Sequence, residues 1–352
     1  MKKKTKHPLP TPTSPIIPDA TSSSSAESFS TGREGYGSGP WFGDFNALCI
    51  TSCIPLPACN LLLPSTALTT GNDTLTSYFQ TSSSSAGAGA GARAEVGEMG
   101  TFEDRCLNTG WPVRDVGSVV VSVLGLAFVT WRILCKSRRM FSAVGRTEIG
   151  FLYMIYSVIL LLQIFTVGGV LVPRTHQNFL MWATALHLGA LVCFFWTLVI
   201  TALVLFQFTD DGTKYMKQFI TGTNIIWMGI VVFLSLDLAW NITGDHHGHS
   251  PGLYFLTLVF PAVAVTFYLV LSCVVVFRKL EIYSSLKYIA MALITFSLSQ
   301  LILFGASYRI AVWTHGHVNG SMFAFLLDLV SVGLTYKFWR SITDDTWGDA
   351  DY

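Results

Sequence analysis

Charged side chains are scarce in this sequence of 352 residues. Asp, Glu, Lys and Arg make up 12% of it, whereas hydrophobic residues make up 51%. Because an ordinary soluble domain carries about 25% charged residues, this composition argues against a soluble protein. A formal net charge of +1 also leaves no excess of basic residues to attract nucleic acid. We therefore expect a protein that contacts the lipid bilayer and binds no nucleic acid.

Several catalytic and signalling motifs are missing as well. The chain has no GxxxxGK[ST] loop for nucleotide phosphates and no HExxH pair of zinc ligands. It also has no DRY-like triplet after the third apolar run and no NPxxY in the last one. We therefore expect no enzyme, no cofactor and no nucleotide-driven cycle. Two alternatives stay open: a seven-helix zinc-dependent membrane hydrolase and a seven-helix receptor-like protein.

Long apolar runs occupy the remainder of the chain after residue 115. A helix needs about 20 apolar residues to cross the roughly 30 Å hydrocarbon core of a bilayer. Uninterrupted runs indicate helices, because the strands of membrane barrels alternate between apolar and polar residues. The sequence predicts an all-α polytopic membrane protein with seven transmembrane helices. Their expected bounds are Val116 to Cys135, Ile149 to Val172, Phe179 to Phe206, Phe219 to Trp240, Leu253 to Phe277, Leu286 to Tyr308 and Ser321 to Phe338.

The distribution of basic residues predicts the topology. Lys and Arg gather after the first, third and fifth apolar runs and in the tail, whereas the alternate connections hold few. Because basic connections stay in the cytosol, we expect a lumenal N-terminus and a cytosolic C-terminus. All three Asn-x-Ser/Thr sequons then fall on the lumenal side. The candidate glycosylation sites are Asn72, Asn241 and Asn319.

Composition and topology together divide the chain into four parts. Residues 1–40 are rich in Lys, Pro and Ser and should form a disordered extension, because they offer little apolar surface to bury. Residues 41–115 form a lumenal, cysteine-containing segment with a low-complexity insert of Ser, Gly and Ala. Residues 116–340 form the seven-helix membrane domain. Residues 341–352 form a short acidic cytosolic tail.

The lumenal segment is predicted to carry a disulfide. Because the lumen is oxidising, a group of four cysteines there indicates one or two bonds, and the sequence does not choose among the three full pairings. The apolar stretch 41–63 is interrupted by Pro55 and Pro57. We therefore expect a packed lumenal lid or an interfacial segment rather than an eighth crossing. The disulfide candidates are Cys49, Cys53, Cys59 and Cys106.

A histidine-rich stretch, NITGDHHGHSPG at 241–252, raises the question of a metal site. Zinc needs three His or carboxylate ligands, and the last two predicted lumenal connections contain enough of them. These residues lie in loops at the membrane edge rather than on facing helices, so we expect no metal site. The residues kept as metal candidates are His246, His247, His249, His315 and His317.

Four motifs occur in order at the expected helix ends. FGDF opens the apolar stretch and is followed by Cys49 and PLPAC, FSAVGRTEI opens the second helix, FQFTDDGT closes the third, and YKFWRSIT ends the seventh. With these motifs the chain resembles the fungal chitin synthase export chaperones over about 41–63 and 101–345. Residues 1–40 and the stretch around 81–92 depart from that family's pattern. The motif residues are Phe42, Gly43, Asp44, Phe45, Gly145, Arg146, Glu148, Asp211, Gly212, Tyr336, Trp339 and Ser341.

The resemblance implies a multi-pass protein of the endoplasmic reticulum membrane. Its implied role is that of a chaperone for folding and export of chitin synthase, a polytopic membrane client, in support of cell-wall chitin synthesis. The acidic tail, TDDTWGDADY, contains Asp349 and Asp351, which could resemble a diacidic signal for contact with a vesicle coat.

Polar residues within the predicted membrane helices are candidates for a functional site. Asp328 lies inside the last helix, and Arg309 ends the sixth on the same side of the membrane. We expect an interhelical pair between Asp328 and Arg309, and a polar site for the client is the alternative. Gln163 and Gln300 should make hydrogen bonds between helices.

Overall fold

The computed structural model describes a set of segments that covers most of the apolar part of the chain. These segments are 42–45, 48–49, 56–62, 115–134, 145–168, 177–206, 213–243, 249–280, 285–314 and 320–343. All of them belong to one compact unit, Pro40–Tyr352, and the other unit, Met1–Gly39, lies outside them. The predicted boundaries at 40, 115 and 340 stay predictions.

The described residues are almost entirely helical, which confirms the predicted all-α class. The elements are η2 (Pro57–Leu62), α4 (Val116–Phe128), η4 (Val129–Leu134), α6 (Arg146–Thr166), α7 (Gln177–Leu205), α8 (Lys214–Trp240), α9 (Pro251–Tyr254), η5 (Phe255–Val259), α10 (Phe260–Val274), η6 (Val275–Leu280), α11 (Leu286–Leu301), η8 (Ile302–Ala306), α12 (Ser307–Trp313) and α13 (Gly320–Thr343). The short η4, η5, η6 and η8 are π-helical turns that continue their neighbouring α-helices.

Six helices in the described segments are long and apolar enough to cross a membrane. They span Arg146–Thr166, Asn178–Leu205, Lys214–Trp240, Pro251–Phe277, Leu286–Ala306 and Gly320–Ile342. The first predicted crossing corresponds to α4 and η4, whose apolar helix, Val116–Trp131, is shorter. At 1.5 Å per residue it is about 24 Å long. The structure thus supports six crossings, and the seventh stays a prediction.

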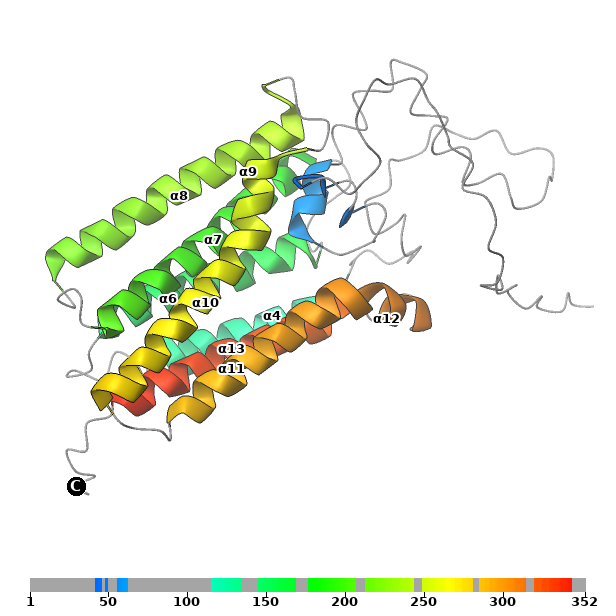
Figure 1. Cartoon of the computed structure of the whole chain (residues 1–352). Helices are drawn as coiled ribbons and strands as arrows, with labels where there is room; N and C mark the ends of the chain where they lie inside the picture. The colour runs from blue at the N-terminus through cyan, green and yellow to red at the C-terminus, as the bar shows by residue number, and fades with distance from the viewer. Residues whose placement is uncertain are drawn as a thin grey trace, which may run out of the picture. The chain divides into compact units, whose positions relative to one another are not determined.

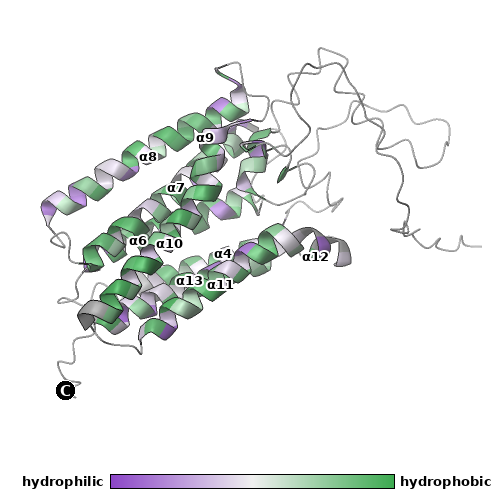
Figure 2. Cartoon of the chain, in the orientation of Figure 1, coloured by the Kyte–Doolittle hydropathy of each residue, from purple (hydrophilic) through white to green (hydrophobic). Residues whose placement is uncertain are grey.

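The outer faces of the helices are apolar. Large hydrophobic side chains are exposed along α4, α8 and α11, for example Leu124 at 63%, Ile225 at 67% and Ile294 at 65%. Figure 2 shows hydrophobic residues along most of the helices, with hydrophilic residues toward the ends of α8. Side chains of this kind are stable in hydrocarbon, whereas in water such continuous exposure promotes aggregation. The exterior therefore fits a bilayer.

Packing divides the helices into two groups. In the first group, α7 packs against α6, α8 and α10. Of its most apolar 18-residue stretch, 78% is buried, compared with 44% or less in the other five membrane-spanning helices. In the second group, α11 packs along α13. Helix α4 joins the groups, because it packs against both α6 and α13 (Figure 1). The two groups are consequently held at their shared boundary by α4 and by side chains.

Small residues allow α4 to approach α13 closely. A Cβ atom added to Gly117 would collide with Met322, and one added to Gly125 would press on Leu329. Membrane helices have no water to expel from between them, so close van der Waals packing at small residues supplies much of their association. The glycines of α4 are therefore part of its contact with α13.

A buried carboxylate fixes the start of both helices. Asp115 caps α4 by accepting a hydrogen bond from the backbone nitrogen of Ser118 at 3.0 Å. The same carboxylate accepts bonds from the hydroxyls of Ser118 and of Ser321, which lies in the first turn of α13. Because Asp115 is only 4% exposed, these bonds form away from solvent. Asp115 thereby sets where α4 meets α13.

The substitution Asp115→Ala should destabilise the protein. It removes the helix cap and the link to Ser321, for which we expect a loss of about 1–3 kcal/mol in unfolding free energy. Denaturant titration of the purified protein in mild detergent measures this loss. Thr130→Ala is the control, because the exposed Thr130 hydroxyl bonds only to carbonyl groups of its own helix. Equal losses in both variants would contradict the role of Asp115.

Candidate functional site

The apolar stretch after residue 40 folds back on one end of the helices. We call its described residues, 42–45, 48–49 and 56–62, the cap. Its helical turn η2 packs against α7 and α8. The buried side chains of Phe45, Cys49 and Leu61 join an apolar cluster with residues of α7, α8 and α9. The cap is thus a packed part of the membrane unit, not a linker to it.

A disulfide between Cys49 and Cys59 closes the cap. It joins the residues after the FGDF motif to η2, and both cysteines are buried. The other two candidates, Cys53 and Cys106, lie outside the described residues. Within the helices, Cys193 and Cys273 have free thiols.

The FGDF motif attaches the cap to the start of α9. Gly43 has φ +98°, and its carbonyl accepts a hydrogen bond from the backbone nitrogen of Ser250 at 3.0 Å. Its Cα lies so close to Pro251 that an added Cβ would come within 2.9 Å of the proline backbone. Asp44 and His249 form an isolated antiparallel bridge. The motif thus contacts the end of the histidine-rich stretch, about 200 residues later in the chain.

Two aromatic residues of the motif strengthen this attachment. The rings of Phe42 and Phe45 both make edge contacts with Tyr254, at centroid distances of 4.8 and 5.7 Å. Such contacts contribute about 0.5–1.5 kcal/mol each beyond the area that they bury. Phe45 is fully buried, whereas Phe42 is 54% exposed. Only the second phenylalanine therefore belongs to the core of the cap.

The structure describes few of the residues predicted as metal or glycan sites. His249, which pairs with Asp44 of the cap, is exposed. Asn241 ends α8 with φ 50°, a left-handed conformation that Asn tolerates better than most residues. Among the described segments, no group of three His, Cys, Asp or Glu side chains could hold a metal. The other candidates lie outside those segments: Asn72, His246, His247, His315, His317 and Asn319.

Two further motifs meet at the opposite end of the helices. Gly145, with φ +70°, precedes α6, and a Cβ there would contact Trp339 Nε1 at 3.9 Å. Trp339 is fully buried, and its ring lies 5.7 Å from that of Tyr336. The Ser341 hydroxyl donates to Ser285 at 3.0 Å. The described part of the first motif, 145–149, and the motif YKFWRSIT therefore meet between the start of α6 and the end of α13.

Glu148 lies in the first turn of α6 and is buried, with an exposed fraction of 1%. Its carboxylate accepts a hydrogen bond from Thr147 at 2.8 Å, and Arg146 is half-buried in the same turn. Burial of the acid inside this contact gives the motif a packing role in addition to any helix-dipole effect. Asp211 and Gly212 lie outside the described residues.

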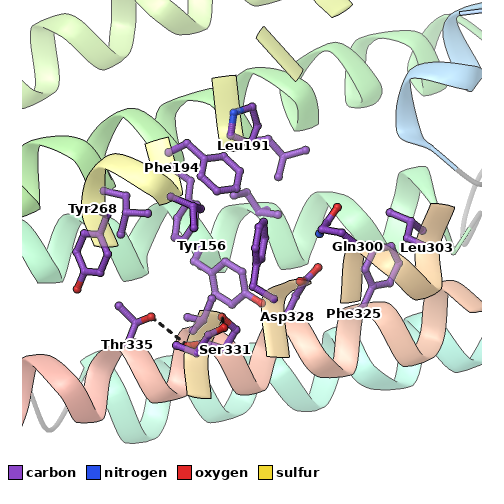
Figure 3. Close-up of a pocket in the computed structure, with 18 of the residues that line it drawn as sticks. Tyr156, Leu191, Phe194, Tyr268, Gln300, Leu303, Phe325, Asp328, Ser331 and Thr335 are labelled. Atoms are coloured by element: carbon purple, nitrogen blue, oxygen red, sulfur yellow. Dashed lines mark hydrogen bonds between the residues drawn. The ribbon is translucent and has the colours of Figure 1, made fainter. Parts of the chain in front are cut away.

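A cavity of about 240 Å³ lies between the two helix groups. One wall comes from α6, α7 and α10, and the other comes from α11, η8 and α13. Leu56 and Pro57 of the cap also line it. Figure 3 shows Asp328 and Gln300 projecting from α13 and α11, with Tyr156 and Phe194 facing them from the first group. The cavity brings intramembrane polar residues together with aromatic ones.

The predicted ion pair between Asp328 and Arg309 is wrong. Asp328 lies beside Ser299 of α11, whereas Arg309 is exposed in α12. Ten residues separate Ser299 from Arg309, which is roughly 15 Å along a helix. The Oδ1 atom of Asp328 is instead buried without a hydrogen-bond partner. The acid therefore faces the cavity rather than a basic side chain.

The side chain of Gln163 was predicted to bond to another helix, but its Nε2 atom has no hydrogen-bond partner. Gln163 is 5% exposed and lines the cavity, and its Nε2 atom is buried without a partner. A buried amide donor without an acceptor is costly. Gln163 Nε2, Asp328 Oδ1 and the Tyr268 hydroxyl are thus three atoms of the cavity lining without a hydrogen-bond partner.

Sequence reasoning missed a polar network that joins the cap to the helices. The side chain of Asn60 donates to the Thr166 carbonyl at 3.1 Å and to the Thr184 hydroxyl at 3.4 Å. Thr166 in turn bonds His187 Nδ1 at 2.7 Å. Asn60 and His187 stand alone among apolar neighbours in the sequence. A polar residue isolated in an apolar run indicates a buried hydrogen bond, because a buried polar group needs a partner.

A comparison with protein families identifies the chain. The family described as chitin synthase export chaperone matches residues 41–350, from the cap to the tail. The chain belongs to the chitin synthase export chaperone family.

Relatives in the family come from several fungi, and each is named chitin synthase export chaperone. The relative in Aspergillus clavatus is 27% identical over 308 residues, which cover 86% of this chain and 83% of the relative. The relative in Cryptococcus neoformans var. neoformans is 28% identical over 233 residues, 64% of this chain and 62% of the relative. The relative in Kluyveromyces lactis is 22% identical over 311 residues, 86% and 92%. No solved structure matches the chain with significance.

In this export-chaperone family member, Gly43→Ala should detach the cap. Alanine strains a backbone at φ +98°, and its Cβ would collide with Pro251, so we expect a loss of about 1–3 kcal/mol. Gly150→Ala in α6 is the control, because no atom lies within 4 Å of a Cβ added at that position. Alanine there should leave stability unchanged or raise it by up to about 1 kcal/mol. Denaturant titration with proteolysis of the cap measures both, and an intact cap in Gly43→Ala would contradict its attachment.

Loss of the Cys49–Cys59 bond should also loosen the cap. Peptide mapping without reductant should recover the two cysteines in one linked species. Cys49→Ser, Cys59→Ser and the double variant should each lose about 2–4 kcal/mol, and the losses should be equal because one bond is removed in every case. Cys273→Ser is the control, since that thiol is free. A linked species that pairs Cys49 with another residue would contradict this arrangement.

Proposed function

We propose that this chain is a membrane-embedded chaperone that promotes the folding and the export of chitin synthase from the endoplasmic reticulum, and so supports cell-wall chitin synthesis. The observation that carries the proposal is the family match over residues 41–350, because it includes the cap and all of the described helices. The proposed role is one of binding, without a catalytic step.

The proposed mechanism is passive. Chitin synthase is a polytopic client, and its membrane helices would pack on the apolar exterior of the chaperone while they assemble. Association of helices in lipid depends on packing at small residues and on hydrogen bonds. Unoccupied outer positions such as Gly222 and Gly229 of α8, where no atom lies within 4 Å of an added Cβ, suit the approach of another helix. Release after assembly would permit packaging into vesicles.

The proposed topology places the N-terminus in the lumen and the C-terminus in the cytosol. The bias of Lys and Arg supports it, and a disulfide in the cap is compatible with an oxidising compartment. The tail would then be available to a vesicle coat through Asp349 and Asp351. Glycosidase treatment of the protein from microsomes should increase its gel mobility, and Asn72→Gln should abolish that change. An unmodified Asn72 accessible to protease from the cytosolic face would contradict the topology.

Deletion of the gene in the source fungus tests the function. Chitin synthase carrying a fluorescent tag should accumulate in the endoplasmic reticulum, and its amount at the cell surface should fall by more than half. Re-expression of the full chain should restore delivery, whereas an unrelated multi-pass surface protein should be delivered normally throughout. Normal delivery of every chitin synthase in the deletion strain would contradict the proposal.

A further inference from the structure

The cavity between the two helix groups has walls suited to hydrocarbon. Phenylalanine rings from both groups line it, including Phe194, Phe195, Phe296 and Phe325. Its volume is about 240 Å³. Apolar walls of this kind hold water poorly and hold apolar groups well. The cavity is therefore built for an organic ligand rather than for a chain of waters.

Three buried polar atoms of the lining residues have no hydrogen-bond partner: the Tyr268 hydroxyl, Asp328 Oδ1 and Gln163 Nε2. Asp328 Oδ1 comes from α13, and Gln163 Nε2 comes from α6, so the pair brackets the cavity from both helix groups. The carboxylate oxygen can accept a hydrogen bond and the amide nitrogen can donate one. Buried groups of this kind are costly unless something satisfies them. Each of these atoms can form a hydrogen bond with a polar group of a ligand.

The rest of the lining defines the charge of the ligand. No Lys or Arg occurs among the residues that line the cavity in the described segments. His187 is the lining residue that could carry positive charge, and its Nδ1 is already bonded to Thr166. A phosphate or carboxylate head group would meet Asp328 without a basic partner, which is strongly unfavourable in a low-dielectric site. The head group should consequently be neutral or cationic.

Helices α10 and α11 both line the cavity, and both also carry exposed hydrophobic side chains on the outer surface. The backbones of α10 and α11 come close at few positions, whereas α11 and α13 pack closely against each other. Val265 and Leu269 of α10 and Leu293 of α11 line the cavity, while Ile294 on the next position is 65% exposed on the outer face. The cavity is thus lined by helices whose other faces border the hydrocarbon of the bilayer. Its natural source of ligands is the membrane itself.

We propose that this cavity binds one membrane amphiphile with a single hydrocarbon chain and a hydroxyl-bearing head group without negative charge. Part of the chain lies among the aromatic side chains, and the polar head group bonds Asp328 and Gln163. Long-chain amino alcohols and monoacylglycerols share this chemistry. The site is independent of the proposed chaperone function, since it rests on the cavity and on the unpartnered atoms of Asp328 and Gln163.

Photocrosslinking of the full-length protein in phosphatidylcholine nanodiscs tests the proposal. The probes are a photoreactive, alkyne-tagged long-chain amino alcohol, a monoacylglycerol and a fatty acid, all with the same chain. We expect at least one hydroxyl probe to label peptides of α6, α11 or α13 at least ten-fold more than the fatty acid does. Preference between the first two probes identifies the head group. Equal labelling by the fatty acid, or labelling confined to other peptides, would overturn the proposal.

Variants of the two polar residues provide the second measurement. Asp328→Leu and Gln163→Leu should each lower labelling about ten-fold, as expected for a lost ligand hydrogen bond. Both should keep the thermal stability of the ligand-free protein or raise it, because each removes an unsatisfied buried group. Ser297→Leu on the exposed face of α11 is the matched control and should label normally. Unchanged labelling in both cavity variants would overturn the proposal. Should either variant fail to fold, competition by the unlabelled amphiphile against the wild-type protein decides the matter in the same way.

Discussion

The contacts of α7 with its neighbouring helices hold the first helix group together. Inside a bilayer, helices gain nothing from the removal of water, so their association must come from close packing and from polar bonds between them. Helix α7 supplies both. It packs against α6, α8, α10 and η2, and its Thr197 receives a hydrogen bond from Asn224 of α8 at 3.0 Å. Its Trp196 donates to Thr223 of α8, also at 3.0 Å.

The second helix group is attached differently, and that difference creates the cavity. Helices α11 and α13 pack on each other, and α13 reaches the first group mainly through α4. Asp115 fixes that attachment at one end, and Trp339 packs beneath Gly145 at the other. Between these ends side chains separate the two groups, and Asp328 Oδ1 and Gln163 Nε2 have no hydrogen-bond partner there. A chaperone with such a boundary has an internal site as well as an apolar exterior.

Much of the helical fold could be predicted from the sequence, because long apolar runs have one stable solution in lipid. The contacts between helices could not. The expected pair of Asp328 and Arg309 shows why: Arg309 lies in α12 and Asp328 in α13, and composition does not encode how far the two residues are offset along the helix bundle. The contact of Asp44 with His249 and the choice of Cys59 as the partner of Cys49 depend in the same way on how the chain folds back. The sequence does not show which partners His187 and Asn60 bond, because each is one polar residue in an apolar run.

We propose that this family member acts on chitin synthase while both lie in the membrane of the endoplasmic reticulum. A vesicle budding reaction with microsomes from the source fungus tests this proposal. Microsomes that lack the protein are compared with microsomes that contain it, and the fraction of chitin synthase packaged into vesicles is measured beside an unrelated multi-pass cargo. The account predicts that packaging of chitin synthase rises several-fold with the protein present, while the other cargo is unaffected. Equal packaging of chitin synthase in the two preparations would contradict it.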